Sequence, residues 1–391
     1  FKQKTAYEIR LSLVGSEMCI RDSYLDSDGF PSIKLDQLFR LSDKTGIFQH
    51  ARYCFPNYAD GYCTDDNVRA LALIMELRPN FATETNELTD TYIAFINHAF
   101  IEKTNGFHNF MSLERSWLDT SCSEDCHGRT LWALGSVVAG KVNLQIQQWA
   151  LDLFEKALPN VAEMTSPRAW AYSLLGINKY LTFFSGDQFV ARYALILENK
   201  MMDIFNRASA SNWQWFEEIL SYDNARLCQA MLVSKREECR TVGVKALQWL
   251  KQVQTAEHGY FQPIGSNGFY RKNGERAYFD QQPIEASAMV SACIAAYQLT
   301  NSQEWITEAE LAFSWFMGKN VAGVPLYSPS SGGCCDGLHV DRANLNQGAE
   351  STIVFLSALT EMKKISSHNP GLNIAASLKH SFFDGVEKLV A

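Results

Sequence analysis

The sequence predicts an all-α fold, an (α/α)6 toroid in which six inner helices are surrounded by six outer helices. Three observations lead to this prediction. A polar turn that runs straight into an apolar helix recurs six times, about every 56 residues, the length of two helices and two loops. The helices that follow these turns alternate with amphipathic helices, and few segments alternate like strands. We expect one domain over residues 24–391, because no linker or break in composition follows residue 24.

The six polar turns mark where the inner helices begin. Each turn offers Asp, Ser or Asn as an N-cap, whose side chain accepts a hydrogen bond from an N–H group of the first helical turn. Pro167 and Pro283 suit the first helical position, where no N–H is needed. In chain order, the turns are residues 64–69, 124–129, 166–170, 222–226, 280–285 and 346–350.

The segments after the turns are apolar on nearly every side and rich in small residues, as in residues 71–75, 131–135 and 286–290. Such helices are buried all round, and small side chains let their neighbours approach closely. Between them lie helices with one apolar stripe, as in residues 88–100, 146–154 and 305–316. A closed double ring suits a chain of 391 residues, which exceeds the roughly 250–300 residues of an ordinary single core. Because every inner helix begins at the same end, we expect all six polar turns at one mouth.

Short strands are expected only on the connections that lead to this mouth. The candidate segments are residues 107–113, 213–216, 260–264 and 268–270. Trp213 and Trp215 alternate around Gln214, which is typical of a strand packed on a helix and equally of an aromatic platform for a ligand. We therefore expect short β-hairpins around the rim.

Composition and charge exclude several classes of function. The net charge is −8, the isoelectric point is about 5.6 and no block of Lys or Arg occurs, so neither nucleic acid nor a membrane is expected as a partner. No apolar run approaches the roughly 18 residues that a membrane span requires. The sequence contains neither a Gly-x-Gly-x-x-Gly turn nor a Walker-type loop, and we expect no cofactor.

The ten cysteines are scattered, many of them in apolar helical segments, where a free thiol behaves as a small hydrophobic group. We therefore expect a reduced, cytoplasmic protein. We expect no bound metal, because Cys122, Cys126 and His127 lack a recognised zinc spacing. Residues 6–23 differ from the rest of the chain. They resemble translated sequencing-adapter read-through of the sort that ends metagenomic gene sequences, and we expect residues 1–23 to be non-native.

Several motifs together resemble a known superfamily. They are residues 45–50 (Thr-Gly-Ile-Phe-Gln-His), 61–67 (Gly-Tyr-Cys-Thr-Asp-Asp-Asn), 280–285 (Asp-Gln-Gln-Pro-Ile-Glu) and 345–351 (Leu-Asn-Gln-Gly-Ala-Glu-Ser). From His50 to Leu359 the chain is similar to bacterial proteins of the six-hairpin glycosidase superfamily that are often labelled glycosyltransferase or glycosidase. The resemblance implies the toroid and an oligosaccharide substrate. Because some such regions follow a glycosyltransferase domain, it also implies a glycosyltransferase as a further partner.

Paired carboxylates are the chemistry expected at the mouth, because cleavage of a glycosidic bond needs an acid for the leaving oxygen and a base or nucleophile on the other face. Asp65, Asp66 and Asp125 stand at helix starts, where an Asp is more often an N-cap than a catalyst. Glu285 and Glu350 lie about one turn into apolar helices, where a carboxylate needs a partner or a purpose. These five are the candidate catalytic residues.

Candidate substrate-binding residues share the mouth with these carboxylates. Aromatic rings offer faces to the apolar sides of sugars, and forked polar groups can bind hydroxyls. Arginines at matching places in the turns could instead form structural ion pairs with the carboxylates. The candidates are His50, Tyr62, Asn67, Arg69, His127, Arg129, Trp213, Trp215, Asp223, Arg226, Asp280, Gln281 and Gln347.

Three hypotheses of different classes follow. The first is a glycoside hydrolase, expected to invert, with Asp66 or Asp125 on one side of the cleft and Glu285 or Glu350 on the other; it fails if arginines lock every such carboxylate. The second is a sugar epimerase or isomerase, which needs groups that titrate near neutrality, so two histidines that face each other in the funnel would favour it. The third is a carbohydrate-binding accessory domain without turnover. The histidines available to the second hypothesis are His50, His127, His258 and His339.

Overall fold

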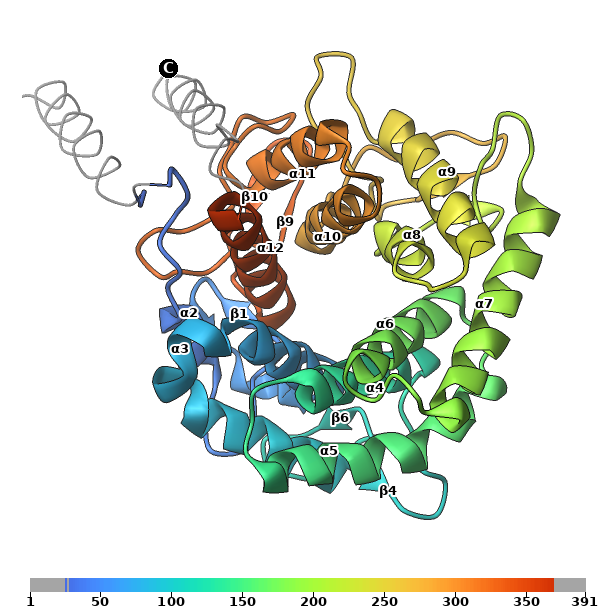
Figure 1. Ribbon diagram of the computed structural model, residues 1–391. Coiled ribbons are helices and arrows are strands. Elements are labelled where there is room, and N and C mark those ends of the chain that lie inside the picture. The colour runs from blue at the N-terminus through green and yellow to red at the C-terminus, as the bar shows by residue number, and fades with distance from the viewer. Residues whose placement is uncertain (1–24, 27, 369–391) are drawn as a thin grey trace, which may run out of the picture.

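The computed structural model describes residues 25–26 and 28–368, and these residues form the toroid that the sequence predicts (Figure 1). The expected non-native segment 1–23 lies outside the described residues. Each inner helix packs on the next one along the chain, and the last packs on the first, so the inner ring closes. The inner helices are α3 (Thr64–Ala99, through its first half), α4 (Glu124–Ala139), α6 (Pro167–Phe183), α8 (Ala225–Leu232), α10 (Pro283–Thr300) and α12 (Ala349–His368).

Four outer helices cover the inner ring, and the second half of α3 is a fifth outer segment. Helices α5 (Leu144–Ala157), α7 (Gln188–Ala208), α9 (Glu237–Val253) and α11 (Gln303–Phe316) pack on α4, α6, α8 and α10 in turn. Helix α3 passes from the inner to the outer ring without a loop, at a kink where Phe81 has the non-helical angles φ −130° and ψ 26°. Pro79 stands two residues before the kink, and proline disrupts helical hydrogen bonding. The described residues thus hold five of the six expected outer segments.

Side chains other than the expected aspartates cap the first two inner helices. The Cys63 thiol accepts a hydrogen bond from the Asp66 N–H, and the Ser123 hydroxyl accepts one from the Cys126 N–H. Asp65, Asp66 and Asp125 therefore lie within the first helical turns, where a negative charge is favourable beside the positive end of the helix dipole. Their carboxylates are left to interact with the mouth.

Small residues let two inner helices touch backbone to backbone. A Cβ atom built on Gly135 of α4 would lie 2.2 Å from the carbonyl oxygen of Gly176 in α6, far inside van der Waals contact. A Cβ on Gly128 would lie 2.6 Å from the carbonyl oxygen of Ala169. The small residues that the sequence places in these two helices thus set the close spacing of α4 and α6.

Five short antiparallel strand pairs lie on the connections of the described residues. As expected, residues 107–113 overlap strands β5 (Gly106–Phe107) and β6 (Phe110–Met111), and residues 268–270 overlap strand β8 (Tyr270–Arg271). The expected strands at 213–216 and 260–264 are wrong: Trp213 and Phe261 make only isolated bridges, with Ala210 and Thr255. Their apolar side chains pack into the core without a partner strand. The pairs are β1 (Ala51–Arg52) with β2 (Phe55–Pro56), β3 (Tyr62–Cys63) with β6 (Phe110–Met111), β4 (Phe100–Ile101) with β5 (Gly106–Phe107), β7 (Ile219–Leu220) with β8 (Tyr270–Arg271), and β9 (Gly337–Leu338) with β10 (Ala343–Asn344). Three of them, β1–β2, β4–β5 and β9–β10, are hairpins.

Candidate functional site

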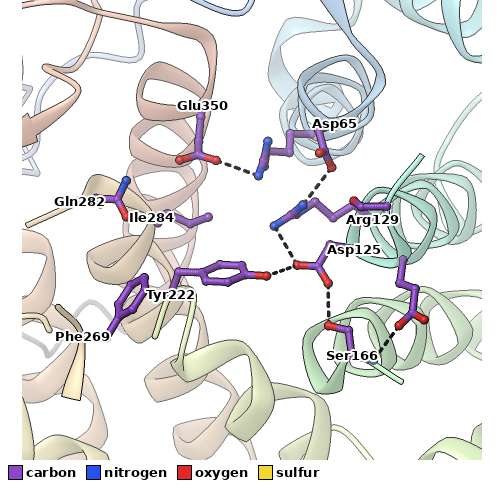
Figure 2. Close-up of a pocket in the computed structure, with 12 residues that line it drawn as sticks. Asp65, Asp125, Arg129, Ser166, Tyr222, Phe269, Gln282, Ile284 and Glu350 are labelled. Carbon is purple, nitrogen blue, oxygen red and sulfur yellow. Dashed lines mark hydrogen bonds and ion pairs between the residues drawn. The ribbon is translucent and has the colours of Figure 1, made fainter. Parts of the chain in front are cut away.

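A cavity of about 650 Å³ opens at the mouth of the ring. Residues from the start of all six inner helices line it, so the six polar turns meet at one place as the sequence predicts. Figure 2 shows how these side chains converge. The lining residues are Asp65, Arg69, Ser123, Glu124, Asp125, Arg129, Ser166, Tyr222, Phe269, Gln282, Ile284 and Glu350.

Arg69 joins two of the candidate carboxylates. Its guanidinium lies 2.8 Å from Asp66 Oδ1 and 2.8 Å from Glu350 Oε2, so it bridges the starts of α3 and α12. Burial raises the pKa of Asp66 to about 6, and the positive charge of Arg69 offsets only part of that effect. Asp66 lies beneath Arg69 and is not among the residues that line the cavity.

Arg129 holds the third carboxylate, Asp65, at a distance of 2.9 Å. It also donates a hydrogen bond of 2.9 Å to the hydroxyl of Tyr172 and lies 4.4 Å from the centre of that ring. Burial alone would raise the pKa of Asp65, but the charges of Arg129 and Arg69 outweigh it, and the pKa of Asp65 falls below its ordinary value. The arginine–carboxylate ion pairs that the sequence left as an alternative are therefore present in the mouth.

Asp125 differs from these carboxylates because hydroxyl groups make its short contacts. Ser166 donates to its Oδ1 at 2.7 Å and Tyr222 donates to its Oδ2 at 2.6 Å, whereas the nearest Arg129 nitrogen lies at 3.9 Å. Neighbouring Glu124 accepts two backbone N–H bonds, at 2.7 Å from Thr165 and 2.6 Å from Ser166, which ties α4 to the start of α6. Arginines thus do not lock every mouth carboxylate.

Glu350 faces Asp125 across the cavity (Figure 2). Its side chain is 38% exposed although Arg69 holds one of its oxygens. Phe269 adds an aromatic face to the lining, and its φ of 59° is a left-handed angle that bulky residues rarely adopt. Gln282 and Ile284, from the start of α10, lie on the same side of the cavity as Glu350 in Figure 2.

A smaller chamber of about 40 Å³ lies on the axis of the ring and shares Arg69, Arg129 and Ile284 with the main cavity. It is lined further by Asp223, Arg226, Glu76 and Glu361, among others. Burial and the neighbouring charge of Glu361 raise the pKa of Glu76 to about 7. The predicted binding residues Asp223 and Arg226 therefore lie beneath the mouth, 3.4 Å apart, and not on its surface.

Glu285 lies in the wall of the ring rather than in the cavity. Its side chain accepts hydrogen bonds on Oε2 from Asn224 at 3.0 Å and from Gln254 at 3.4 Å, while its buried Oε1 has no hydrogen-bond partner. Burial and the charge of Asp223 raise the pKa of Glu285 to about 7. Ile284, one residue earlier, occupies the cavity-facing position instead.

Other predicted binding residues lie outside the lining of the cavity and contact neighbouring groups of the protein. Tyr62 is buried and donates to Asp43, Asn67 donates to the Cys63 carbonyl, and His127 contacts the Ala157 carbonyl at 3.0 Å. The structure buries Trp213 and Trp215 in the core, and Trp213 packs edge-on against Trp249. Gln281 is also buried, and it accepts a hydrogen bond from Trp315.

His50, Asp280 and Gln347 lie on connections outside the lining. Near His50, burial raises the pKa of Asp336 above its usual value, although a hydrogen bond from the Gly348 N–H opposes this. Asp280 contacts His339 at 2.6 Å, and Gln347 accepts a hydrogen bond from Ser331. None of the residues that line the cavity is a histidine.

Seven of the lining residues are not among the site residues predicted from the sequence: Ser123, Glu124, Ser166, Tyr222, Phe269, Gln282 and Ile284. Tyr222 and Ser166 each precede the cap or first turn of an inner helix, so their place in the polar turns was the available signal. Within the described ranges, no group of three or more His, Cys, Asp or Glu side chains could hold a metal ion. Helices long and apolar enough to cross a membrane are likewise absent from residues 25–26 and 28–368.

Comparison with known proteins identifies the fold. No family model and no curated protein matches the sequence. Among solved structures, a cellobiose 2-epimerase from Spirochaeta thermophila superposes with a TM-score of 0.66 at 11% identity, covering 93% of this chain and 100% of that one. A D-mannose isomerase gives 0.63 at 11% identity, covering 85% and 95%. A glycoside hydrolase family 76 mannosidase from Bacteroides thetaiotaomicron gives 0.60 at 8% identity, covering 84% and 94%. These likenesses show that the chain is an (α/α)6 toroid.

Proposed function

We propose that the protein is a glycoside hydrolase that acts on an oligosaccharide, with Asp125 and Glu350 as its carboxylate pair. The observation that supports the proposal most strongly is that these two carboxylates line one cavity from facing sides. They start α4 and α12, and both helices pack on α3, which separates them. In an inverting mechanism the two carboxyl groups stand about 6.5–9.5 Å apart, which admits a water molecule beside the sugar.

The surroundings of the pair suit a sugar ring. Phe269 offers an aromatic face, and Gln282 offers an amide for hydroxyl groups. Tyr222 and Ser166 orient Asp125, and Arg69 orients Glu350, so both carboxylates are held in place before a substrate arrives. Preorganised groups cost no rearrangement during the reaction, which is where such sites gain rate.

The test is hydrolysis of manno- and gluco-oligosaccharides, followed by chromatography of the products. We expect D125N and E350Q each to lower kcat at least about 100-fold, the lower bound for loss of general acid–base catalysis. E218Q is the matched control, because Glu218 is exposed and paired with Lys272 away from the cavity. Nitrophenol leaves with little protonation, so hydrolysis of a nitrophenyl glycoside hardly needs the general acid. The variant that keeps activity on this substrate is therefore the one that lacks the general acid. Wild-type rates in both variants would refute the proposal.

A sugar epimerase or isomerase is the second candidate. Two observations favour it: the solved structures with similar folds include a cellobiose 2-epimerase and a D-mannose isomerase, and Asp280 contacts His339 on the connections into α10 and α12. The lining of the cavity lacks the facing histidines that this chemistry would use. Incubation in heavy water followed by NMR separates the candidates, because epimerisation changes the sugar and incorporates deuterium while the glycosidic bond survives. Binding without any turnover would instead indicate the accessory domain.

A further inference from the structure

The hairpin β1–β2 and the turn after it carry the three most exposed aromatic side chains of the described residues. Tyr53 is 61% exposed, Phe55 is 65% exposed and Tyr58 is 57% exposed. Single exposed apolar residues are ordinary, but three aromatic residues within six positions make a patch. The Tyr58 ring lies 4.9 Å from that of Phe48, which anchors it to the packed aromatic residues beneath.

The backbone conformation of Tyr53 is unusual for an aromatic residue. Arg52 pairs with Phe55 in the hairpin, so Tyr53 and Cys54 form a two-residue turn, and Tyr53 has a φ of 55°. A positive φ at the first central position is normally given to glycine, because a bulky side chain is strained there. A strained residue that the fold nevertheless holds in place points to a use for its side chain.

The fold does hold this turn in place, and it does so beside the cavity. The Tyr53 N–H donates to Asn346 at 2.9 Å, and the Gln347 N–H donates to the Tyr53 carbonyl at 2.8 Å. Two residues later Ala349 donates to the Gln49 carbonyl at 3.0 Å, and Glu350 of the cavity follows directly. The hairpin is therefore continuous with the wall that carries Glu350.

The other end of the same segment leads to the start of α3. The Gln49 N–H donates to the Gly61 carbonyl at 3.1 Å, just before α3 and its cavity residues Asp65 and Arg69 begin. The backbone that carries the aromatic patch is thus hydrogen-bonded to the segments that lead into α12 and α3, and both of these helices contribute residues to the cavity.

We propose that Tyr53, Phe55 and Tyr58 form a platform on which sugar rings of the glycan stack outside the cavity. The inference rests on the proposed function and specifies its substrate: a glycan chain longer than the cavity holds. Aromatic faces suit the apolar faces of sugar rings, and the same segment carries the exposed polar residues Arg52 and Asn57, whose side chains can bind hydroxyl groups. The protein accordingly prefers longer chains.

The test compares binding of mannohexaose with mannobiose, and of cellohexaose with cellobiose, by calorimetry in an E350Q background that prevents turnover. Y53G removes the ring and relieves the strained backbone, so it keeps or raises the thermal midpoint. We expect Y53G and F55A each to weaken hexasaccharide binding about tenfold, the effect of losing roughly 50 Å² of apolar burial, with disaccharide binding unchanged. F183A is the matched control, because Phe183 is 53% exposed at the far end of α6.

Several results of these binding measurements would contradict the platform. Unchanged hexasaccharide binding in Y53G and F55A, an equal loss for disaccharide and hexasaccharide, or no binding of either hexasaccharide by the E350Q protein would overturn it. A dimer that F55A dissociates in sedimentation, without an effect on glycan binding, would assign the patch to self-association. If hexasaccharide binding depends on Tyr53 but the wild-type protein hydrolyses no glycan, the platform stands and the proposed hydrolase fails.

Discussion

Replacing Glu285 by Gln should stabilise the protein at neutral and alkaline pH. Glu285 is buried, its Oε1 has no hydrogen-bond partner, and the charge of Asp223 lies nearby. A neutral amide avoids the burial of a second charge beside Asp223 and can still accept the hydrogen bonds of Asn224 and Gln254. This prediction also decides between a structural and a catalytic role for Glu285.

The size of the effect follows from the pKa of Glu285. Folding raises it from 4.5 to about 7, and each unit corresponds to about 1.4 kcal/mol. Below the pKa that Glu285 has in the unfolded state, both states carry the proton, and the ionisation of Glu285 costs the folded protein no stability. As the pH rises, the unfolded state ionises first, and the folded protein loses stability until the pH exceeds the folded pKa. E285Q should therefore gain up to about 3 kcal/mol over the wild type at about pH 8, and much less at about pH 4.

The assay is urea denaturation of both proteins across this pH range, with E218Q as an exposed control whose stability should follow the wild type. The difference in free energy of unfolding between E285Q and the wild type should grow with pH and level off above about pH 7. Glycan hydrolysis by E285Q should stay close to the wild-type rate. A destabilised E285Q at about pH 8, or a difference that does not vary with pH, would show that the buried charge of Glu285 does not destabilise the protein.

Three further predictions concern packing, charge and reactivity. G135A should lose about 1–3 kcal/mol of stability in thermal denaturation, because its Cβ meets the backbone of α6. G186A should have no effect, because the space around Gly186 is open. Equal stability of the two variants would contradict the close approach of α4 and α6. R69M should lose about 3 kcal/mol of the free energy of unfolding in urea at neutral pH, because the buried charge of Asp66 loses its partner. The loss should be smaller in acid, where Asp66 is protonated. A loss that does not vary with pH would show that the charge of Asp66 is not its cause. Cys122, whose pKa is lowered to about 6 by hydrogen bonding from Cys126 and His127, should react with iodoacetamide before the buried thiols in peptide mapping, and earlier labelling of Cys228 would contradict this.

The ring itself could be predicted because its signal is repeated. Each inner helix begins after a polar turn and continues with small apolar residues, and six such units leave few alternatives to a closed ring. The direct passage from the inner to the outer ring in α3 was not predictable from periodicity, because the kink at Phe81 leaves both halves with ordinary helical patterns. Nor could alternation distinguish Trp213 and Trp215 in the core from a platform at the surface.

The candidate site was predictable as a region but not as a set of side chains. Successive residues of a helix point about 100° apart, so Ile284 faces the cavity and Glu285 turns into the wall, a rotation that an all-apolar helix does not reveal. Asp66 lies beneath Arg69 for the same reason, while Asp65 reaches the lining. Tyr222 was missed because its role depends on a hydrogen bond to Asp125, 97 residues away in the sequence.

A crystal structure of the E350Q protein with a bound hexasaccharide would show whether Asp125 and Glu350 flank the site of hydrolysis. We expect one sugar ring in the cavity between α4 and α12, with the Asp125 carboxylate within about 3 Å of the oxygen of a glycosidic bond or of a water beside it. A glycan bound elsewhere, with no sugar atom near Asp125, would contradict the assignment of this cavity as the site of hydrolysis.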